Sequence, residues 1–357
     1  MAYDPLLTTG LLQVHAMYRQ EHPISNFLRN FFFGNAPVIS RYRYVTIEVQ
    51  RAGQKVATSI RRGSEPTHVL GTDPYKRSIY EPPYFAGQSA ITAEDLGTLA
   101  FGESAETPFD DNTKTLMVLA EKQTNIEKRF ERAKELMAAE VLLNGEVTMV
   151  DGSKIVFDID PTLIGVNPAV KWDTSGGTGV DILGDIYTWA MRIFTKSGVM
   201  PNSMVVAPDV HKLMVNDTAV QKAMDIRNFS LGTITASALA DYPGVTDGGK
   251  IMVPGIGAIQ IYTYASKYDL AGTPTDMLPA GTVILANSNN MGRFMYAACD
   301  SRGANGMPAY VPAETLVLVD KSNEFPYPAK VIVQMAPIAA PVSLDTWMSA
   351  NVLVNAA

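Results

Sequence analysis

Residues 110–144 read DDNTKTLMVLAEKQTNIEKRFERAKELMAAEVLLN and contain neither glycine nor proline. This composition predicts one long helix, about 50 Å in length at ~1.5 Å per residue. Asp110 can cap its free amides, and Gly145 can adopt the left-handed conformation that ends a helix. Charged residues, Glu135 among them, occupy the other faces. Apolar residues recur at helical spacing and predict one buried stripe: Leu119, Ile126, Phe130, Ala133 and Met137.

The composition predicts a folded chain with a small share of charge. Of its 357 residues, 46% are hydrophobic and 18% are charged, against about 25% charged in a typical soluble domain. Either much of the surface faces other subunits, or the value is ordinary variation between families, and composition leaves both open. The net charge of −7 and the pI of about 5.2 argue against a surface that binds nucleic-acid phosphates tightly.

The single cysteine, Cys299, permits no disulfide within the chain and favours a reducing compartment. The first residues lack the basic and apolar regions of a signal peptide, so secretion is not expected. The longest apolar run, residues 331–344, is short for a bilayer and contains Pro337 and Pro341. We therefore expect no membrane span.

Residues 1–40 are predicted to form an N-terminal arm with a short helix near residues 23–29. Phe31, Phe32 and Phe33 follow that helix directly. Three adjacent aromatic rings cannot share one face of a lone segment, so another surface must cover them. They pack either on this chain's own core or across a neighbouring subunit, and we favour the neighbour.

Residues 41–92 are predicted to form an extended loop that starts as a hairpin. Residues 42–50 alternate apolar and polar side chains as a strand does. Residues 61–83 form a polar excursion that is long for an ordinary connection. The charge of this region is mostly positive, carried by Arg51, Lys55, Arg61, Arg62, Lys76 and Arg77.

The segment after the loop is acidic, and residues 81–111 contain no lysine or arginine. Its carboxylates include Glu94, Asp95, Glu103 and Glu106. Opposite charges on two parts of one chain favour head-to-tail assembly, in which the loop of one copy meets the acidic segment of the next. The alternative is that both are solvated surface.

The rest of the chain predicts an α+β fold with one domain inserted into another. Residues 93–175 combine the long helix with a hairpin that turns at Asp151 and form the first part of a peripheral domain. Residues 176–309 form an inserted axial domain of α/β type. Residues 310–357 return to the peripheral domain, where the strand at 330–335 is expected to pair with that hairpin. The axial domain is predicted to hold a helix at 180–198 and strands at 204–207, 250–253, 258–264, 282–286 and 294–298.

No catalytic, cofactor-binding or metal-binding pattern emerges. The four histidines, His15, His22, His68 and His211, form no paired metal motif. His211 is expected at a partly exposed helix surface, and Cys299 is expected to be a buried apolar residue. The glycine-rich stretches complete no phosphate-binding fingerprint. We predict that the protein is not an enzyme and that it has no cofactor and no metal site.

Four stretches carry a resemblance to a known family: residues 143–149 (LNGEVTM), 278–287 (LPAGTVILAN), 292–300 (GRFMYAACD) and 333–338 (VQMAPI). Together with the order of arm, loop, long helix, hairpin, inserted domain and returning strand, they resemble the major capsid proteins of tailed phages. These proteins have the Hong Kong 97 (HK97) fold, and the likeness is to the lambda-like E-type branch. The resemblance covers the chain from about residue 25.

The resemblance implies a protein that self-assembles into hexamers and pentamers of an icosahedral phage head around packaged double-stranded DNA. It implies partners in the form of a scaffolding protein, a decoration protein and a portal, and assembly in the cytoplasm of the host bacterium. Some relatives crosslink a loop lysine to a neighbour; Lys55 and Lys76 are candidates by location only. Two alternatives remain open: the shell of an encapsulin-like cellular compartment, and a cytosolic enzyme with a scattered site.

Overall fold

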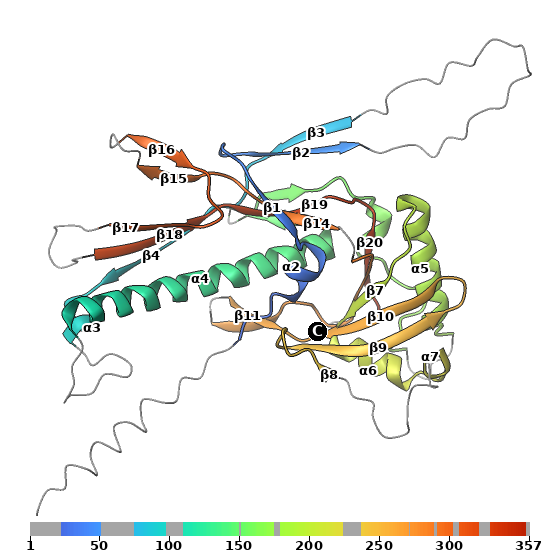
Figure 1. The fold of residues 1–357 in the computed structure, drawn as a ribbon. Coiled ribbons are helices and arrows are strands. Elements are labelled where there is room, and N and C mark those ends of the chain that lie inside the picture. Colours follow the sequence, from blue (N-terminus) through green and yellow to red (C-terminus); the bar gives the residue numbers. More distant parts are fainter. Residues whose placement is uncertain are drawn as a thin grey trace, which may run out of the picture.

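The computed structural model describes residues 23–50, 75–97, 110–149, 151–174, 179–223, 237–270, 272–288, 291–302, 307–320 and 329–354. One long helix crosses the molecule, with small sheets along one side of it (Figure 1). A lobe of mixed helices and strands lies at its C-terminal end. The predicted α+β class is confirmed.

The long helix is α4 (Asp111–Asn144), which begins within one residue of the predicted start. The Asp110 carboxylate accepts a hydrogen bond from the backbone N–H of Asn112. Gly145 ends the helix at a φ of 68°, and its N–H donates to the carbonyl of Val141. Both termini are therefore satisfied by residues next to the helix in sequence, which is why the sequence predicts them.

A three-stranded antiparallel sheet of the described residues, in the order β17-β18-β4, packs against α4. Phe130 of the predicted stripe contacts buried side chains that alternate along the central strand: Val331, Val333 and Met335. The strands are β17 (Leu316–Asp320), β18 (Ala329–Met335) and β4 (Phe85–Ile91).

The strand predicted at residues 330–335 does not pair with the hairpin that turns at Asp151, so that prediction is wrong. The hairpin is a separate sheet of β5 (Glu146–Thr148) and β6 (Lys154–Val156). β18 lies instead between β17 and β4, since its apolar side chains must cover the stripe of α4. β4 consequently belongs to this sheet, although the sequence assigned residues 41–92 to the extended loop.

The lobe contains a six-stranded sheet of the described residues, in the order β20-β13-β7-β10-β9-β8. β7 and β10 run parallel, and the other neighbours run antiparallel. β20 joins this sheet by pairing with β13, although it lies in residues 310–357, which the sequence placed in the peripheral domain. The strands are β7 (Ser203–Val206), β8 (Ser237–Ala238), β9 (Val245–Val253), β10 (Gly257–Tyr264), β13 (Thr282–Ala286) and β20 (Trp347–Asn351).

The two faces of the six-stranded sheet are covered by different elements, because side chains alternate along each strand. Ile259 and Ile261 of β10 lie on the face covered by α5 and α6. Val205 and Ile284 lie on the opposite face, against α2 and the end of α4. The helices of this region are α2 (Phe27–Phe32), α5 (Ile182–Ser197), α6 (Pro208–Asn216) and α7 (Thr218–Ala223).

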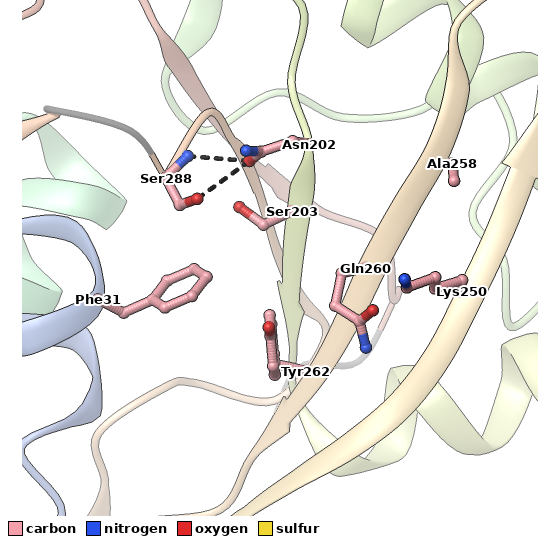
Figure 2. A pocket seen from close by; sticks show the side chains of 8 residues that line it. All are labelled: Phe31, Asn202, Ser203, Lys250, Ala258, Gln260, Tyr262 and Ser288. Atoms are coloured by element: carbon pink, nitrogen blue, oxygen red, sulfur yellow. Dashed lines mark hydrogen bonds between the residues drawn. The ribbon is translucent and has the colours of Figure 1, made fainter.

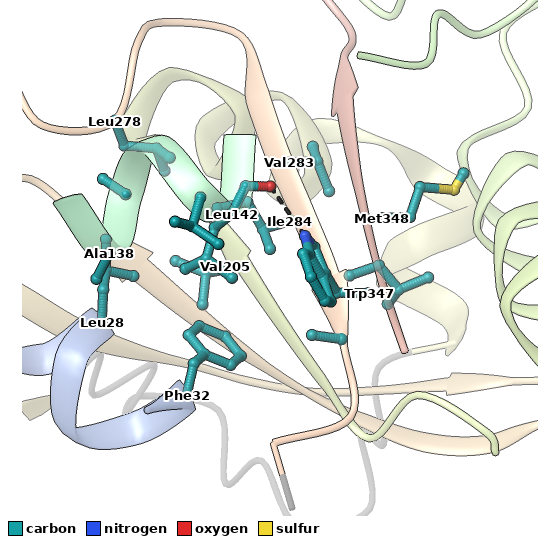
Figure 3. Packing of buried hydrophobic residues seen from close by; sticks show 14 of the residues in the cluster. Leu28, Phe32, Ala138, Leu142, Val205, Leu278, Val283, Ile284, Trp347 and Met348 are labelled. Atoms are coloured by element: carbon teal, nitrogen blue, oxygen red, sulfur yellow. Dashed lines mark hydrogen bonds between the residues drawn. The ribbon is translucent and has the colours of Figure 1, made fainter. Parts of the chain in front are cut away.

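The main core lies where α2, the end of α4 and the six-stranded sheet meet (Figure 3). Leu142 of α4 is fully buried there beside Trp347 of β20, whose Nε1–H donates to the Leu142 carbonyl at 3.1 Å. Ser349 Oγ–H donates to the carbonyl of Leu143 at 2.7 Å. These bonds satisfy carbonyls of the last helical turn and attach the rod to the sheet.

Smaller sheets complete the described part of the chain. β14 pairs with β1 and β19, which brings the segment after α2 beside residues from the C-terminal third. The β2–β3 hairpin projects from the body (Figure 1). The remaining elements are β1 (Asn35–Ile39), β2 (Val45–Gln50), β3 (Tyr75–Tyr80), α3 (Ala93–Gly97), η1 (Pro161–Leu163), β11 (Lys267–Leu270), β12 (Thr273–Asp276), β14 (Gly292–Tyr296), β15 (Cys299–Arg302), β16 (Pro308–Val311) and β19 (Pro337–Pro341).

Candidate inter-subunit surfaces

The aromatic run that was expected to cover a neighbour lies largely inside this chain. Phe32 and Phe33 are buried, and Phe31 is half-buried against Tyr262 of β10, with 5.0 Å between ring centroids. Phe33 packs edge-on against Phe294. The expectation is corrected for Phe32 and Phe33, because residues that fill this core offer no surface to another copy.

Glu135 of α4 fixes α2 in place. Its carboxylate accepts hydrogen bonds from the backbone N–H groups of Leu28 and Arg29 at 2.9 and 3.0 Å, and from the hydroxyl of Tyr264 at 2.9 Å. The side chain of Asn26, at the N-cap, makes no capping bond, so Glu135 takes that role from 107 residues away. Burial raises the pKa of the Glu135 carboxyl to about 7.

The sequence analysis placed Glu135 on a solvent face of the helix, and the structure shows it fully buried. A signal was available: Glu135 shares a helix face with Ala138 and Leu142, three and seven residues further on, and that face leads to the apolar last turn of α4 at residues 141–143. Arg29 of α2 also pairs with Glu131 of α4. Lys134 of α4 contacts Glu131 as well, with 2.6 Å between Lys134 Nζ and the carboxylate. The buried end of the rod thus holds α2 through charged groups as well as apolar ones.

The basic loop is only partly described. Lys76 lies 3.4 Å from Asp158, and Arg77 pairs with Glu48 across the β2–β3 hairpin at 2.6 Å. Both pairs are exposed, so they hold the hairpin weakly and leave the two cations near its surface. The other predicted loop cations lie outside the described residues: Arg51, Lys55, Arg61 and Arg62.

The acidic segment divides into a structural and an exposed part. Asp95 accepts a hydrogen bond from Lys122 Nζ at 2.6 Å, and this bond lowers the pKa of Asp95 to about 2. Lys122 also donates to the carbonyl of Ala90, so the pair ties β4 and α3 to the rod. Asp95 is therefore committed within the chain, while Glu94 is exposed. Glu103 and Glu106 lie outside the described residues.

Exposed apolar side chains on the projecting hairpin were not singled out from the sequence. Tyr75 and Ile79 of β3 are exposed, and Tyr42 stacks on Tyr44 at the base of the hairpin, with 5.5 Å between ring centroids. The alternation of β2 could have indicated this surface, since a two-stranded ribbon can bury only one of its faces on its own body. Contact of this hairpin with another copy remains a prediction.

A hollow of about 280 Å³ opens between α2 and the face of the six-stranded sheet (Figure 2). The Asn202 side chain accepts hydrogen bonds from the N–H and hydroxyl of Ser288 at one end of it. The lining contains no histidine, cysteine or carboxylate, and so no general acid–base pair. Its residues are Phe31, Asn202, Ser203, Lys250, Ala258, Gln260, Tyr262 and Ser288.

The groups with catalytic potential are isolated. Cys299 is buried, and burial raises the pKa of its thiol, which disfavours the reactive thiolate. His211 is partly exposed, as expected, and its Nε2 is buried without a hydrogen-bond partner among the described residues. Within those same ranges, no cluster of three or more candidate ligands could hold a metal ion. No helix in the described part of the chain is long and apolar enough to cross a membrane.

Comparison with known proteins agrees with the resemblance seen in the sequence. Residues 13–352 match the family described as phage major capsid protein E. The fold is similar to a protein described as a prophage capsid protein from E. coli CFT073, with 15% identity over 99% of both chains and a TM-score of 0.65. It is also similar to the SrpI encapsulin of Synechococcus elongatus PCC 7942, with 11% identity over 99% of this chain and 96% of that one and a TM-score of 0.50. No curated protein sequence matches the chain. The HK97-like fold expected from the sequence is thereby confirmed.

Proposed function

Because the chain belongs to the phage major capsid protein E family and is a capsid shell protein of the virion, we propose that it forms both hexamers and pentamers of an icosahedral head. The head would enclose packaged double-stranded DNA. The observation that carries this proposal is a body anchored by the buried end of α4 together with a β2–β3 hairpin whose Tyr75 and Ile79 are exposed.

A shell of this kind sums many interfaces, so each subunit needs a rigid body together with surfaces that its own fold does not cover. The rigid body is supplied by α4, clamped by Trp347, Ser349 and the Glu135 network. The uncovered surface includes Tyr75 and Ile79 on the hairpin. The same body can then occupy hexamers and pentamers if the projecting parts adjust.

We assign the parts of the chain to roles on this basis. The rod with the β17–β18–β4 sheet forms the peripheral domain, and the six-stranded sheet with α5, α6 and α7 forms the axial domain, to which β20 is now added. The segment at 41–92, apart from β4, is the loop that reaches a neighbouring copy. Residues 1–40 form the arm, of which α2 is held on the chain's own core.

The net charge of −7 suits a wall that lies near packaged DNA without binding it tightly. A scaffolding protein, a decoration protein and a portal are the further partners we propose, with assembly in the host cytoplasm. A structural role is supported by membership of the phage major capsid protein E family.

Electron microscopy of the purified protein, expressed alone and together with the neighbouring phage genes, tests the proposal. Closed shells with both five-fold and six-fold capsomers, which take up DNA in the complete phage system, are the expected result. Shells filled with a protein cargo and lacking DNA would support the cellular compartment instead. A small soluble oligomer in every condition would contradict the shell function and favour an enzyme.

A further inference from the structure

Helix α5 presents an apolar stripe that this chain leaves partly uncovered. Tyr187 and Phe194 are 43% and 40% exposed, although both are large and seven residues apart on one face. Leu183 and Met191 lie half-buried on the same face. The stripe, defined as Leu183, Tyr187, Met191 and Phe194, flanks the buried face of α5; Leu183 also packs against the core, and the Tyr187 ring lies near Gly255 in the β9–β10 turn.

The three charged side chains of α5 do not make this stripe polar, because each of them bonds to a residue outside the helix. Asp185 accepts a hydrogen bond from the indole N–H of Trp172 at 2.9 Å. Lys196 pairs with Asp160 at 2.6 Å, and Arg192 donates to the carbonyl of Thr162 at 3.2 Å. These partners all lie in residues 160–172, on one flank of the helix. A helix face that meets water normally carries charge, and the stripe carries none.

The opposite face of the same sheet has an uncovered region of a different shape. Gln260 and Tyr262 of β10 point away from the face that bears Ile259 and Ile261, and they line the hollow beside Phe31 (Figure 2). Next to the hollow, Met252 is 48% exposed and pairs in register with Ala258, which is also exposed. α2 covers only part of this face, so the hollow and the Met252–Ala258 pair form a seat of mixed character, in which Phe31, Met252 and Ala258 are apolar and the other lining groups are polar.

The stripe and the seat lie on opposite faces of one sheet and differ in shape. Because they lie on opposite faces, a single neighbouring copy cannot engage both at once, so the contact is head-to-tail, and repetition of that contact closes a ring when the rotation allows it. The charges at their margins are opposite, with exposed Asp181 at the start of α5 and exposed Lys250 at the rim of the hollow.

We propose that the α5 stripe of one copy docks on the open sheet face of the next copy, and that the ring of Tyr187 or Phe194 enters the hollow. The occupant is a second copy of this chain, because both halves of the contact are present on each molecule and the protein builds a shell from copies of itself. The inference deepens the proposed function and rests on it, since it names the axial-domain surfaces that would form each capsomer ring.

Paired cysteines test the contact in assembled shells. Phe194→Cys combined with Ala258→Cys, and Tyr187→Cys combined with Met252→Cys, are treated with a short thiol-to-thiol cross-linker; the native Cys299 is buried. The expected result for at least one pair is a ladder of covalent multimers up to five or six subunits, while each single variant stays monomeric on a denaturing gel. The matched control is Phe194→Cys with Leu270→Cys, because Leu270 is 68% exposed and lies on β11, outside both surfaces. Shells in which neither pair cross-links, or in which a single cysteine gives dimers, overturn the proposal.

A charge placed on the stripe provides a second test that does not depend on cross-linking geometry. Phe194→Asp is expected to lower the yield of shells at least tenfold, while the unassembled subunit keeps the circular dichroism and melting temperature of the original. Leu270→Asp is expected to leave the yield within about twofold. Shells formed by Phe194→Asp at the original yield overturn the stripe as an interface. A failure of the unsubstituted protein to form shells would instead count against the proposed function itself, so the two failures are distinguishable.

Discussion

The two ends of α4 differ in what surrounds them. Near its start, Leu116 is 67% exposed and Met117 is also exposed. Near its end, Val141 and Leu142 are fully buried, and Trp347 and Ser349 bond to the carbonyls of the last turn. The comparison teaches that one continuous helix can anchor a fold with one half and carry uncovered surface on the other. We therefore expect contacts between copies to involve the first half, whereas the second half maintains the shape of the subunit.

The largest expected difference between the two ends is in the cost of removing a leucine. Leu142→Ala is expected to lower the free energy of unfolding by about 3–5 kcal/mol, because it leaves a cavity between α4, β20 and β13. Leu116→Ala is expected to change it by less than ~0.5 kcal/mol, since the side chain already meets water. Urea unfolding of unassembled subunits, followed by circular dichroism, measures both. Equal costs at the two positions would remove the distinction between the ends.

The second prediction concerns pH and the buried end. Burial raises the pKa of Glu135 to about 7, above its ordinary 4.5, so the folded state binds more protons than the unfolded state between these values. The resulting stabilisation is fully present below pH 4.5 and is lost as the pH rises through about 7. At about 1.4 kcal/mol per pKa unit, the change amounts to ~3 kcal/mol.

The groups around Glu135 are Leu28 N–H and Arg29 on α2, Glu131 and Lys134 on α4, and Tyr264 on β10. Glu135→Gln cannot ionise, so the difference in unfolding free energy between this variant and the original is expected to vary with pH across that window. Urea unfolding at pH values from 4.5 to 8 measures it. A difference that stays constant across the window would mean that Glu135 does not titrate there.

These two predictions show where sequence reasoning succeeded and where it stopped. The start and end of α4 depend on Asp110 and Gly145, which are adjacent to the helix, and both were predicted. The burial of Glu135 depends on α2, about a hundred residues away, whose N–H groups satisfy the carboxylate. Periodicity reports that a face is buried or polar; it does not report which distant backbone donors make a buried charge tolerable.

The sheets repeat this lesson. Strands β17 and β18 were both predicted from the sequence, but the pairing of β18 with β17 and β4 was not, because several apolar strands could equally cover α4. Phe32 and Phe33 were recognised as needing cover, and only the folded chain shows that its own core supplies it. For the assembly surfaces, residue type indicated charge on the loop and in the acidic segment. The pairing of Asp95 with Lys122 within the chain could be recognised only from the folded structure.

The third prediction addresses the junction at which the buried half of α4 ends. Gly145 has a φ of 68°, and a Cβ placed there would lie 2.9 Å from Cδ1 of Ile159. Gly145→Ala is expected to lower the free energy of unfolding by about 1–2 kcal/mol, mostly from the left-handed backbone. Gly145→Asn should cost less, because asparagine tolerates that conformation better, although it has the same Cβ. If both substitutions cost the same, the contact with Ile159 and not the backbone conformation sets the requirement for glycine.

The smallest effect is expected at the exposed half, where an ion pair adds to the apolar contacts that Leu119 and Ile126 make with the sheet. Lys122 donates to Asp95 at 2.6 Å and to the carbonyl of Ala90 at 2.7 Å, and both charged side chains are partly exposed. Lys122→Ala is expected to lower the free energy of unfolding by about 1 kcal/mol, since water can replace much of what the ammonium provides. Arg129→Ala, on the same helix and also charged, is the matched control because Arg129 is exposed. Thermal melts of unassembled subunits at low and high salt measure both variants. A loss as large as that of Leu142→Ala would mean that the ion pair anchors the rod as firmly as its core does, and the two halves of α4 would then no longer differ in kind.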